Sequence, residues 1–286
     1  RPNVKNQNIK NQNELINLEK NKTSIIEQIF FERAGLKLEQ KGYEFFSYKN
    51  NSSLSGGVQD TYLLNSGDQI TLVLQGGTNK VLRQTITREG IVFFNFTSPI
   101  SAAGRNFGEV RDEILDRVKN DLVETKAYVS LGRVRQIDVS VLGEVFLPGS
   151  FQVSGLSDLI HILSLSGGIK KTGSLRNILI INENGTHEID LYDFIYKNKS
   201  ISSIKNAITD ETVILVPPIG STIAITGNSI RPGIFEIKEE ESLLIQELIK
   251  FSGGILRPGP YKVDRQGVNS KGIESFEGAI SQNAIL

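Results

Sequence analysis

The chain of 286 residues has no cysteine, no methionine and no tryptophan. Without cysteine it has no disulfides, no thiolate ligands for a metal and no thiol nucleophile. Histidine is almost as scarce, because only His161 and His187 occur and neither belongs to a dense ligand motif such as H-E-x-x-H. A histidine that follows Ile160 on a predicted helix is more often packed or half-exposed than catalytic. The sequence therefore predicts no catalytic, cofactor-binding or metal-binding residues.

The chain also has no excess of charge and no long apolar run. Lys and Arg together number 32, as do Asp and Glu, so nucleic acid is not an expected partner. Apolar runs such as Ile91–Phe94 and Val213–Val216 are strand-sized, far below the roughly 18 to 20 residues of a membrane helix. The composition is that of a folded protein of two or three compact units. Because the chain begins at Arg1, we expect a processed protein or a segment of a longer one.

The N-terminal region, residues 1–57, combines a helical segment with a linker. Its first residues are rich in asparagine and glutamine, which predicts a poorly ordered lead or a frayed helix. Ser24 and Glu27 have the spacing of a capping box, and the apolar stripe behind them predicts a helix that ends at Gly35. The aromatic residues Tyr43, Phe45 and Phe46 are expected to dock on a neighbouring domain. Residues 50–57 read as a linker.

The pattern of residues 58–135 predicts an α+β layer, in which several strands pack with one helix. Short β-favouring runs alternate with turn sequences such as Ser66-Gly67-Asp68. We expect one helix, capped by Asn106, with apolar residues from Phe107 to Leu122 at spacings of three and four. The expected strands are Tyr62–Leu64, Ile70–Leu74, Val81–Thr87, Ile91–Phe94 and Ala127–Leu131.

An internal repeat is the most specific feature of the sequence. Residues 143–153 read GEVFLPGSFQV, and residues 227–237, 84 positions later, read GNSIRPGIFEI. After a two-residue insertion, LSLSGG at 163–168 corresponds to IKFSGG at 249–254. The shared positions are Gly143 and Gly227, Pro148 and Pro232, Gly149 and Gly233, Gly167 and Gly253, and Gly168 and Gly254. We interpret this agreement as a duplicated domain of about 80 residues, whose glycines and prolines are structural.

Each copy predicts a strand, a Pro-Gly turn, a second strand and a helix that Ser-Gly-Gly ends. The helix is expected to be capped by Ser157 in the first copy and by Ser242 in the second. Asn184-Gly185 predicts a hairpin after the first helix. The later strands of the first copy are expected at Arg176–Ile181, His187–Leu191 and Val213–Val216, whereas the second copy is expected to lack its last strands. This order is that of a β-grasp fold, with one helix across a mixed sheet.

Three sequences suggest chemistry that local structure explains better. GGIKKT at 167–172 is similar to a phosphate loop, but its glycines follow a helix and read as a C-cap. Glu239–Glu241 precede a helix, where the helix dipole favours acidic residues, and Asp190 and Asp193 flank another short helix in the same way. Glycoside cleavage would need paired carboxylates about 5 to 9.5 Å apart, and aromatic platforms are scarce at 7% aromatic residues. We therefore do not predict an enzyme.

Two patterns resemble known domains. V-x-V-x-G-E-V from Val139, P-G-S-F, a capped helix and S-G-G resemble the soluble-ligand-binding β-grasp (SLBB) domain. YLLNSGDQITL at 62–72 resembles the opening of the polysaccharide export domain. Over residues 62–259 the chain resembles the outer-membrane polysaccharide export family, which exports capsule and exopolysaccharide in Gram-negative bacteria. Residues 24–46 resemble the helical preface of larger members. The chain lacks the lipobox cysteine and C-terminal amphipathic helix of small members, so we expect a fragment of a longer protein.

The resemblance implies an α+β fold class with four parts. These are an N-terminal helical segment and linker at 1–57, a polysaccharide export α/β sandwich at 58–135, a first SLBB β-grasp domain at 136–219 and a second one, expected to be truncated, at 220–286. It also implies a periplasmic, outer-membrane-associated conduit that forms a homo-oligomer and works with a polysaccharide chain and an inner-membrane polysaccharide copolymerase. The alternative is a monomeric carbohydrate-binding or adaptor module of the cell envelope. The sequence does not identify residues that contact the polysaccharide.

Overall fold

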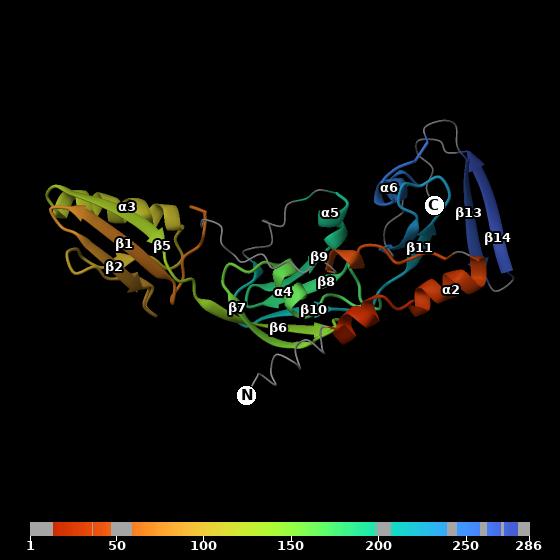
Figure 1. Ribbon diagram of the computed structural model, residues 1–286, viewed down its shortest axis with the longest axis horizontal. Coiled ribbons are helices and arrows are strands. Elements are labelled where there is room, and N and C mark those ends of the chain that lie inside the picture. Colours follow the sequence, from red (N-terminus) through yellow and green to blue (C-terminus); the bar gives the residue numbers. More distant parts are fainter. Residues whose placement is uncertain are drawn as a thin grey trace.

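In the computed structural model the described residues are 14–35, 37–46, 59–197, 199, 207–238 and 245–257, together with the backbone of 262–269 and 272–279. They form three groups of helices and strands along the long axis of the molecule (Figure 1). The first two groups are joined by residues 133–135, which lead directly into a strand of the central group. Helices and sheets occur together in the groups, which confirms the predicted α+β fold class.

The first group, which we name the α3 unit (residues 59–132), is an antiparallel sheet covered on one face by a helix (Figure 1). Its strand order is β2-β1-β5, and a small separate pair joins β3 to β4. The bounds are β1 Gln69–Gly76, β2 Lys80–Thr85, β3 Ile91–Val92, β4 Ile100–Ser101, α3 Phe107–Asp121 and β5 Thr125–Leu131. Alternate residues of β1, including Ile70 and Leu72, are buried with Val110 and Ile114 of α3. Period-2 and helical patterns therefore meet in one core.

Two details that the sequence predicts for this unit are wrong. Tyr62–Leu64 is not a strand but contributes a single bridge, between Leu63 and Asn106. Asn106 occupies the N-cap of α3, yet its side chain makes no capping hydrogen bond. Its Nδ2 instead donates to Oε1 of Glu109 across 3.1 Å. Capping uses the side-chain oxygen of the N-cap residue as an acceptor, whereas this contact uses the amide N–H of Asn106 as a donor and so does not cap the helix.

The first repeat is a five-stranded mixed sheet with the order β7-β6-β10-β8-β9. Strands β6 and β10 are parallel, and the other neighbours are antiparallel. The bounds are β6 Gln136–Gly143, β7 Gly149–Ser154, α4 Leu159–Leu165, β8 Ile178–Asn182, β9 Gly185–Ile189, α5 Leu191–Ile195 and β10 Thr212–Val216. One face of α4 is buried through Leu159, Ile162 and Leu163. A hairpin, a helix and further strands thus follow one another as the sequence predicts.

Two local predictions in this repeat shift by one residue. Asp158, not Ser157, caps α4, and its carboxylate accepts from N of His161 across 2.8 Å. The Ser157 hydroxyl is buried and has no hydrogen-bond partner in the described part of the chain. The β8–β9 turn consists of Glu183 and Asn184, because Asn182 pairs with Gly185, which begins β9. The strands expected at Arg176–Ile181 and His187–Leu191 therefore lie at Ile178–Asn182 and Gly185–Ile189.

The second repeat contains a hairpin, a helix and a second hairpin. Its bounds are β11 Thr222–Ile225, β12 Gly233–Glu236, α6 Ile245–Phe251, β13 Lys262–Asn269 and β14 Gly272–Ala279. The expectation that this copy lacks its last strands is wrong for two of them, because β13 and β14 pair over eight positions. Ser242 and Glu239–Glu241 lie outside the described residues.

Both repeats have the same backbone hydrogen bonds around Ser-Gly-Gly. In the first, N of Phe146 donates to O of Gly168 (3.2 Å); in the second, N of Ile230 donates to O of Gly254 (3.0 Å). The preceding glycines, Gly167 and Gly253, both have a φ of 80°. The sequence repeat is therefore also a repeat of backbone geometry at these turns.

The two repeats share one core, to which the N-terminal segment adds. Phe235 and Phe251 of the second repeat are buried in the same cluster as the sheet of the first. The rings of Tyr192 and Phe251 meet edge to face, 5.5 Å apart. Oε2 of Glu236, which is almost fully buried, accepts from N of Leu175 across 2.8 Å. We therefore expect the repeats to unfold together rather than as independent domains.

The N-terminal strap, residues 14–35 and 37–46, binds both repeats. Its residues 14–20 are helical, followed by α2 (Ile25–Ala34) and a 3₁₀ turn (Tyr43–Phe46). The capping box of Ser24 and Glu27 and the left-handed Gly35 are as predicted. Tyr43 and Phe46 are buried in the shared core, whereas Phe45 is more exposed. The predicted docking of these aromatic residues is thus confirmed for two of the three.

Candidate functional site

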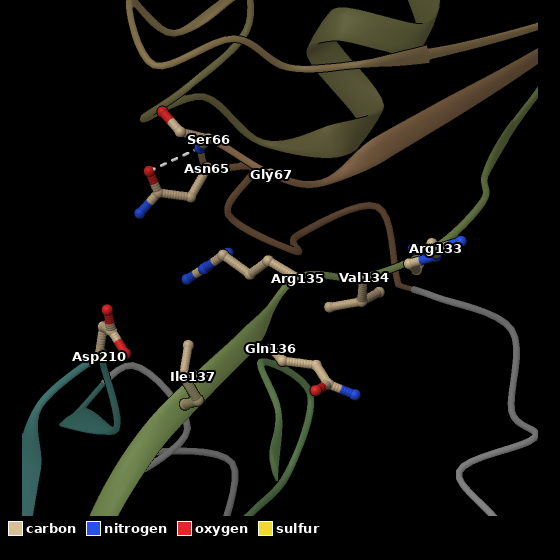
Figure 2. A pocket seen from close by; sticks show the side chains of 9 residues that line it. All are labelled: Asn65, Ser66, Gly67, Arg133, Val134, Arg135, Gln136, Ile137 and Asp210. Atoms are coloured by element: carbon tan, nitrogen blue, oxygen red, sulfur yellow. Dashed lines mark hydrogen bonds between the residues drawn. The ribbon is translucent and has the colours of Figure 1, made fainter. Parts of the chain in front are cut away.

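A cavity of about 790 Å³ opens where the α3 unit meets the first repeat. Its lining comes from the turn before β1, the segment that leads into β6 and the turn before β10 (Figure 2). The lining residues are Asn65, Ser66, Gly67, Arg133, Val134, Arg135, Gln136, Ile137 and Asp210. Because the two units have separate cores, the cavity lies at a joint.

Asp68 holds this joint together. Its side chain is fully buried, and Oδ1 accepts from the backbone N of Arg135 across 2.9 Å. Oδ2 accepts from N of Asn65 (2.9 Å) and from Nη1 of Arg135 (3.1 Å). The Tyr62 hydroxyl donates to the same oxygen across 3.1 Å. A buried carboxylate is costly unless it is paired and hydrogen-bonded, and this one has four donors. Asp68 therefore fixes residues 133–135 against the start of β1.

Tyr62 lies between the two charges of the joint, since its hydroxyl also accepts from Nη1 of Arg135 across 3.1 Å. Burial raises the pKa of the Tyr62 phenol far above its ordinary value, the charge of Asp68 raises it further, and Arg135 opposes the change. The phenol is thus protonated at neutral pH and acts as a hydrogen-bond donor.

The far wall of the cavity is built around Asp210, whose Oδ1 accepts from N of Asp138 across 2.8 Å. Glu211 follows with a φ of 60°, and its N donates to O of Asp138. The cavity thus offers a carboxylate, amides, a hydroxyl and guanidinium groups. Among the described residues, no group of three potential metal ligands occurs. This lining can bind polar groups, and it contains no nucleophile with an adjacent base.

A second candidate surface is the sheet face of the α3 unit that α3 leaves uncovered, which we name the open face. Strand pairing places Val73 between Val81 and Tyr128 on this face. Tyr128 is 57% exposed and Val81 is 51% exposed. The neighbouring row contains Arg83, Thr71 and Ser130. The residues of β1, β2 and β5 that point to the open face are Gln69, Thr71, Val73, Gln75, Val81, Arg83, Thr85, Lys126, Tyr128 and Ser130.

The open face has the chemistry of a polar, positively charged platform. It carries an aromatic ring, hydroxyl and amide groups and the two cations Arg83 and Lys126, and its strand residues include no carboxylate. Sequence reasoning missed this surface. The alternation of Lys126, Tyr128 and Ser130 in β5 was the available signal, but only the pairing with β1 and β2 brings the cations and the ring together.

The repeat glycines and prolines, the two histidines, Asp190 and Asp193 do not line the cavity, whereas Asn65, Ser66 and Gly67 of the 62–72 motif do. The repeat glycines and prolines lie at the turns of the two repeats, and Gly167 and Gly168 follow α4. His161 is on α4 and His187 is on β9. Asp190 caps α5 and binds the buried guanidinium of Arg176, where Nη2 lies 3.0 Å from Oδ2.

Comparison with known proteins identifies the α3 unit. Residues 57–132 match the family described as polysaccharide biosynthesis/export protein. These residues form a polysaccharide export domain. The export domain thus corresponds to the α3 unit. The open face lies on this domain, and the cavity lies where the domain meets the first repeat. In the described part of the chain, no helix is long and apolar enough to span a membrane.

Two relatives extend the similarity beyond the export domain. The chain is 25% identical over 243 residues to the polysialic acid transport protein KpsD of Escherichia coli, a match that covers 82% of this chain. It is 24% identical over 181 residues, 63% of its length, to the EPS I polysaccharide export outer membrane protein EpsA of Ralstonia solanacearum. The matches span 42% and 48% of these relatives. The predicted resemblance to outer-membrane polysaccharide export proteins is confirmed, and neither name describes a catalytic reaction.

Proposed function

We propose that the chain is a non-catalytic wall component of a conduit that passes a polysaccharide through the periplasm, in association with the outer membrane. The observation that carries this proposal is the open face of the export domain. It presents an exposed aromatic ring between hydrogen-bonding groups and two cations, without carboxylates. Such a surface suits weak, repeated contact with a hydrated polymer, because each contact is shallow and solvent-exposed.

The charge of the open face favours an acidic polymer. Arg83 and Lys126 are both exposed and lie on the same face of the sheet as Tyr128. One of the relatives is named for polysialic acid, a polymer with a carboxylate on each sugar. We therefore propose an acidic polysaccharide as the substrate, the Tyr128 ring as its stacking platform and the two cations as contacts for its carboxylates.

A conduit also needs several copies around one axis. Heterologous contacts between copies in the same orientation generate a ring when the rotation closes. We propose that the export domain and the two repeats, as SLBB β-grasp domains, form the side surfaces of this homo-oligomer. By resemblance, an inner-membrane polysaccharide copolymerase is the proposed partner at one end.

Measurement of mass in solution together with polymer binding tests the proposal. We expect oligomers, and weak binding of polysialic acid that falls with salt, with weaker binding of uncharged dextran. Tyr128→Ala should weaken binding by about tenfold, equivalent to about 1.4 kcal/mol. Val123→Ala is the control, because Val123 is 85% exposed in the same domain but lies in the turn before β5. A monomer that binds sugar with micromolar affinity would show a carbohydrate-binding module instead, and cleavage of the polymer would show an enzyme.

A further inference from the structure

The first hairpins of the two repeats pair in the same register, so their backbone groups point the same way. Val141 pairs with Gly149 in the first repeat, and Ile225 pairs with Gly233 in the second. N of Gly155 donates to O of Arg135, which shows that odd-numbered residues of β7 are hydrogen-bonded to β6. Antiparallel pairs alternate. The N–H and C=O of Ser150 therefore point away from β6, as those of its counterpart Ile234 point away from β11.

The outer edge of β12 is occupied in this chain. N of Ile234 donates to O of Glu39 across 2.9 Å, and N of Lys41 donates to O of Ile234 across 2.9 Å. The strap thus runs parallel to β12 at Gln40 and makes a single β-bridge with Ile234. This edge of the repeat accepts a further backbone segment with ordinary hydrogen bonds.

The equivalent edge of β7 is open. β7 ends the five-stranded sheet, and Ser150 and Gln152 are exposed. Among the described residues, no backbone group pairs with Ser150 on its outer side. The strand reads GSFQVS, with no charge and no proline. Natural proteins commonly protect exposed edge strands with charged residues or prolines. An edge strand without them favours pairing with a partner strand.

The other end of the same sheet is also an open edge. β9 pairs only with β8 in the described residues, and its residues 185–188 are exposed. The pairings β7-β6, β10-β8 and β8-β9 are antiparallel and β6-β10 is parallel, so β9 runs antiparallel to β7. Two copies side by side in the same orientation therefore bring β9 of one against β7 of the next as an antiparallel pair, the more stable kind.

We infer that β7 and β9 form the contact between neighbouring copies of this chain, joining their five-stranded sheets head to tail. The contact is heterologous, because different strands meet, and it suits a ring. The outward N–H and C=O of Ser150 supply hydrogen bonds of the kind that Ile234 makes with the strap. The inference rests on the homo-oligomer of the proposed function and assigns its interface.

Engineered cysteines test the pairing, because the chain has none of its own. Gln152→Cys is combined in turn with Thr186→Cys, His187→Cys and Glu188→Cys in the full chain, which covers neighbouring registers. Under oxidation, at least one double variant should give a ladder of disulfide-linked species, and each single variant should not. Dimers from Gln152→Cys alone would mean that β7 meets β7, and would overturn the inference.

Ser150→Pro provides a second test, because it removes the outward N–H without removing a hydrogen bond to β6. We expect it to weaken self-association at least tenfold. Ser150→Ala also loses the contact between the Ser150 and Ser140 hydroxyls, 3.1 Å apart, but keeps the N–H, and should change association less than twofold. Oligomers that give no ladder and survive Ser150→Pro would overturn this interface and leave the conduit standing. A chain that is monomeric at every concentration would overturn the conduit as well.

Discussion

Nη1 of Arg135 lies 3.1 Å from Oδ2 of Asp68, and this ion pair joins the export domain to the first repeat. Asp68 is fully buried, so replacing it by Asn leaves the guanidinium and two backbone N–H groups facing a neutral amide. We expect Asp68→Asn to lower the free energy of unfolding by about 3 to 5 kcal/mol, as for other broken buried ion pairs. Urea unfolding measures the change.

Asp60→Asn is the matched control, because Asp60 also pairs with an arginine, Arg111, but is 62% exposed. Exposed pairs contribute about 0 to 1 kcal/mol, so this variant should unfold almost as the natural chain does. Equal losses in both variants would contradict the role of Asp68 in the joint.

The joint shows what the sequence can and cannot reveal. Ser66-Gly67-Asp68 is predictable as a turn, because its chemistry is local. The partners of Asp68 are not, since Arg135 lies 67 positions further along the chain. The repeat turns are predictable for the same reason as the first turn. The β-bridge between the strap and β12 has no sequence signal, because it depends on backbone groups that any residue carries. The open face likewise depends on the pairing of three strands.

Tyr62→Phe tests the joint through its pH dependence. The variant loses the hydroxyl that donates to Asp68, so at neutral pH we expect about 1 to 2 kcal/mol less stability. Burial, and then Asp68, raise the pKa of Tyr62 in the folded state above its ordinary value of 10.0. A raised pKa stabilises the fold fully below the ordinary value, and this contribution is lost as pH rises toward the folded pKa.

The difference between the natural chain and Tyr62→Phe should therefore shrink as pH rises above 10.0, since phenylalanine does not titrate. Urea unfolding at several pH values, with tyrosinate absorbance as a second signal, measures it. A difference that is constant or grows over this range would show that the Tyr62 hydroxyl is not buried beside Asp68.

Glu27 attaches the strap to the first repeat. It is 4% exposed, and Nζ of Lys171 lies 2.8 Å from its Oε1. Glu27 also accepts from N of Gln40, the residue that bridges to Ile234 of β12. We expect Glu27→Gln to cost about 3 kcal/mol and to make the lysines of the strap more accessible to trypsin. Limited proteolysis followed by mass spectrometry locates the first cuts.

A double-mutant cycle of Glu27→Gln and Lys171→Ala should give a coupling of about 1 to 3 kcal/mol. Glu32→Gln is the control, because Glu32 lies on the same helix but is exposed and binds only Gln28 in the described structure. Cuts elsewhere in the chain before the strap, or additive effects of the two changes, would contradict this attachment.

Gly168 and Gly254 occupy equivalent positions in the two repeats. Alanine variants at these positions distinguish the cost of backbone strain from the cost of overpacking. Both have positive φ, 89° and 99°, so alanine at either should cost about 1 to 2 kcal/mol. A Cβ on Gly254 would approach only Ile230, at 3.7 Å, whereas one on Gly168 would lie 2.6 Å from Cβ of Phe46 in the strap. Such a contact cannot be relieved by a side-chain rotation, because Cβ moves only with the backbone.

We therefore expect Gly168→Ala to cost about 1 to 3 kcal/mol more than Gly254→Ala, the added amount being the overpacking of Phe46. Gly168→Ala should also expose the strap to trypsin, which Gly254→Ala should not, because only the first glycine touches it. Urea unfolding and proteolysis of the two variants side by side measure both effects. Equal stability and equal proteolysis would mean that Phe46 does not pack against the Ser-Gly-Gly turn of the first repeat, and that the repeats differ less in their contacts than in their sequences.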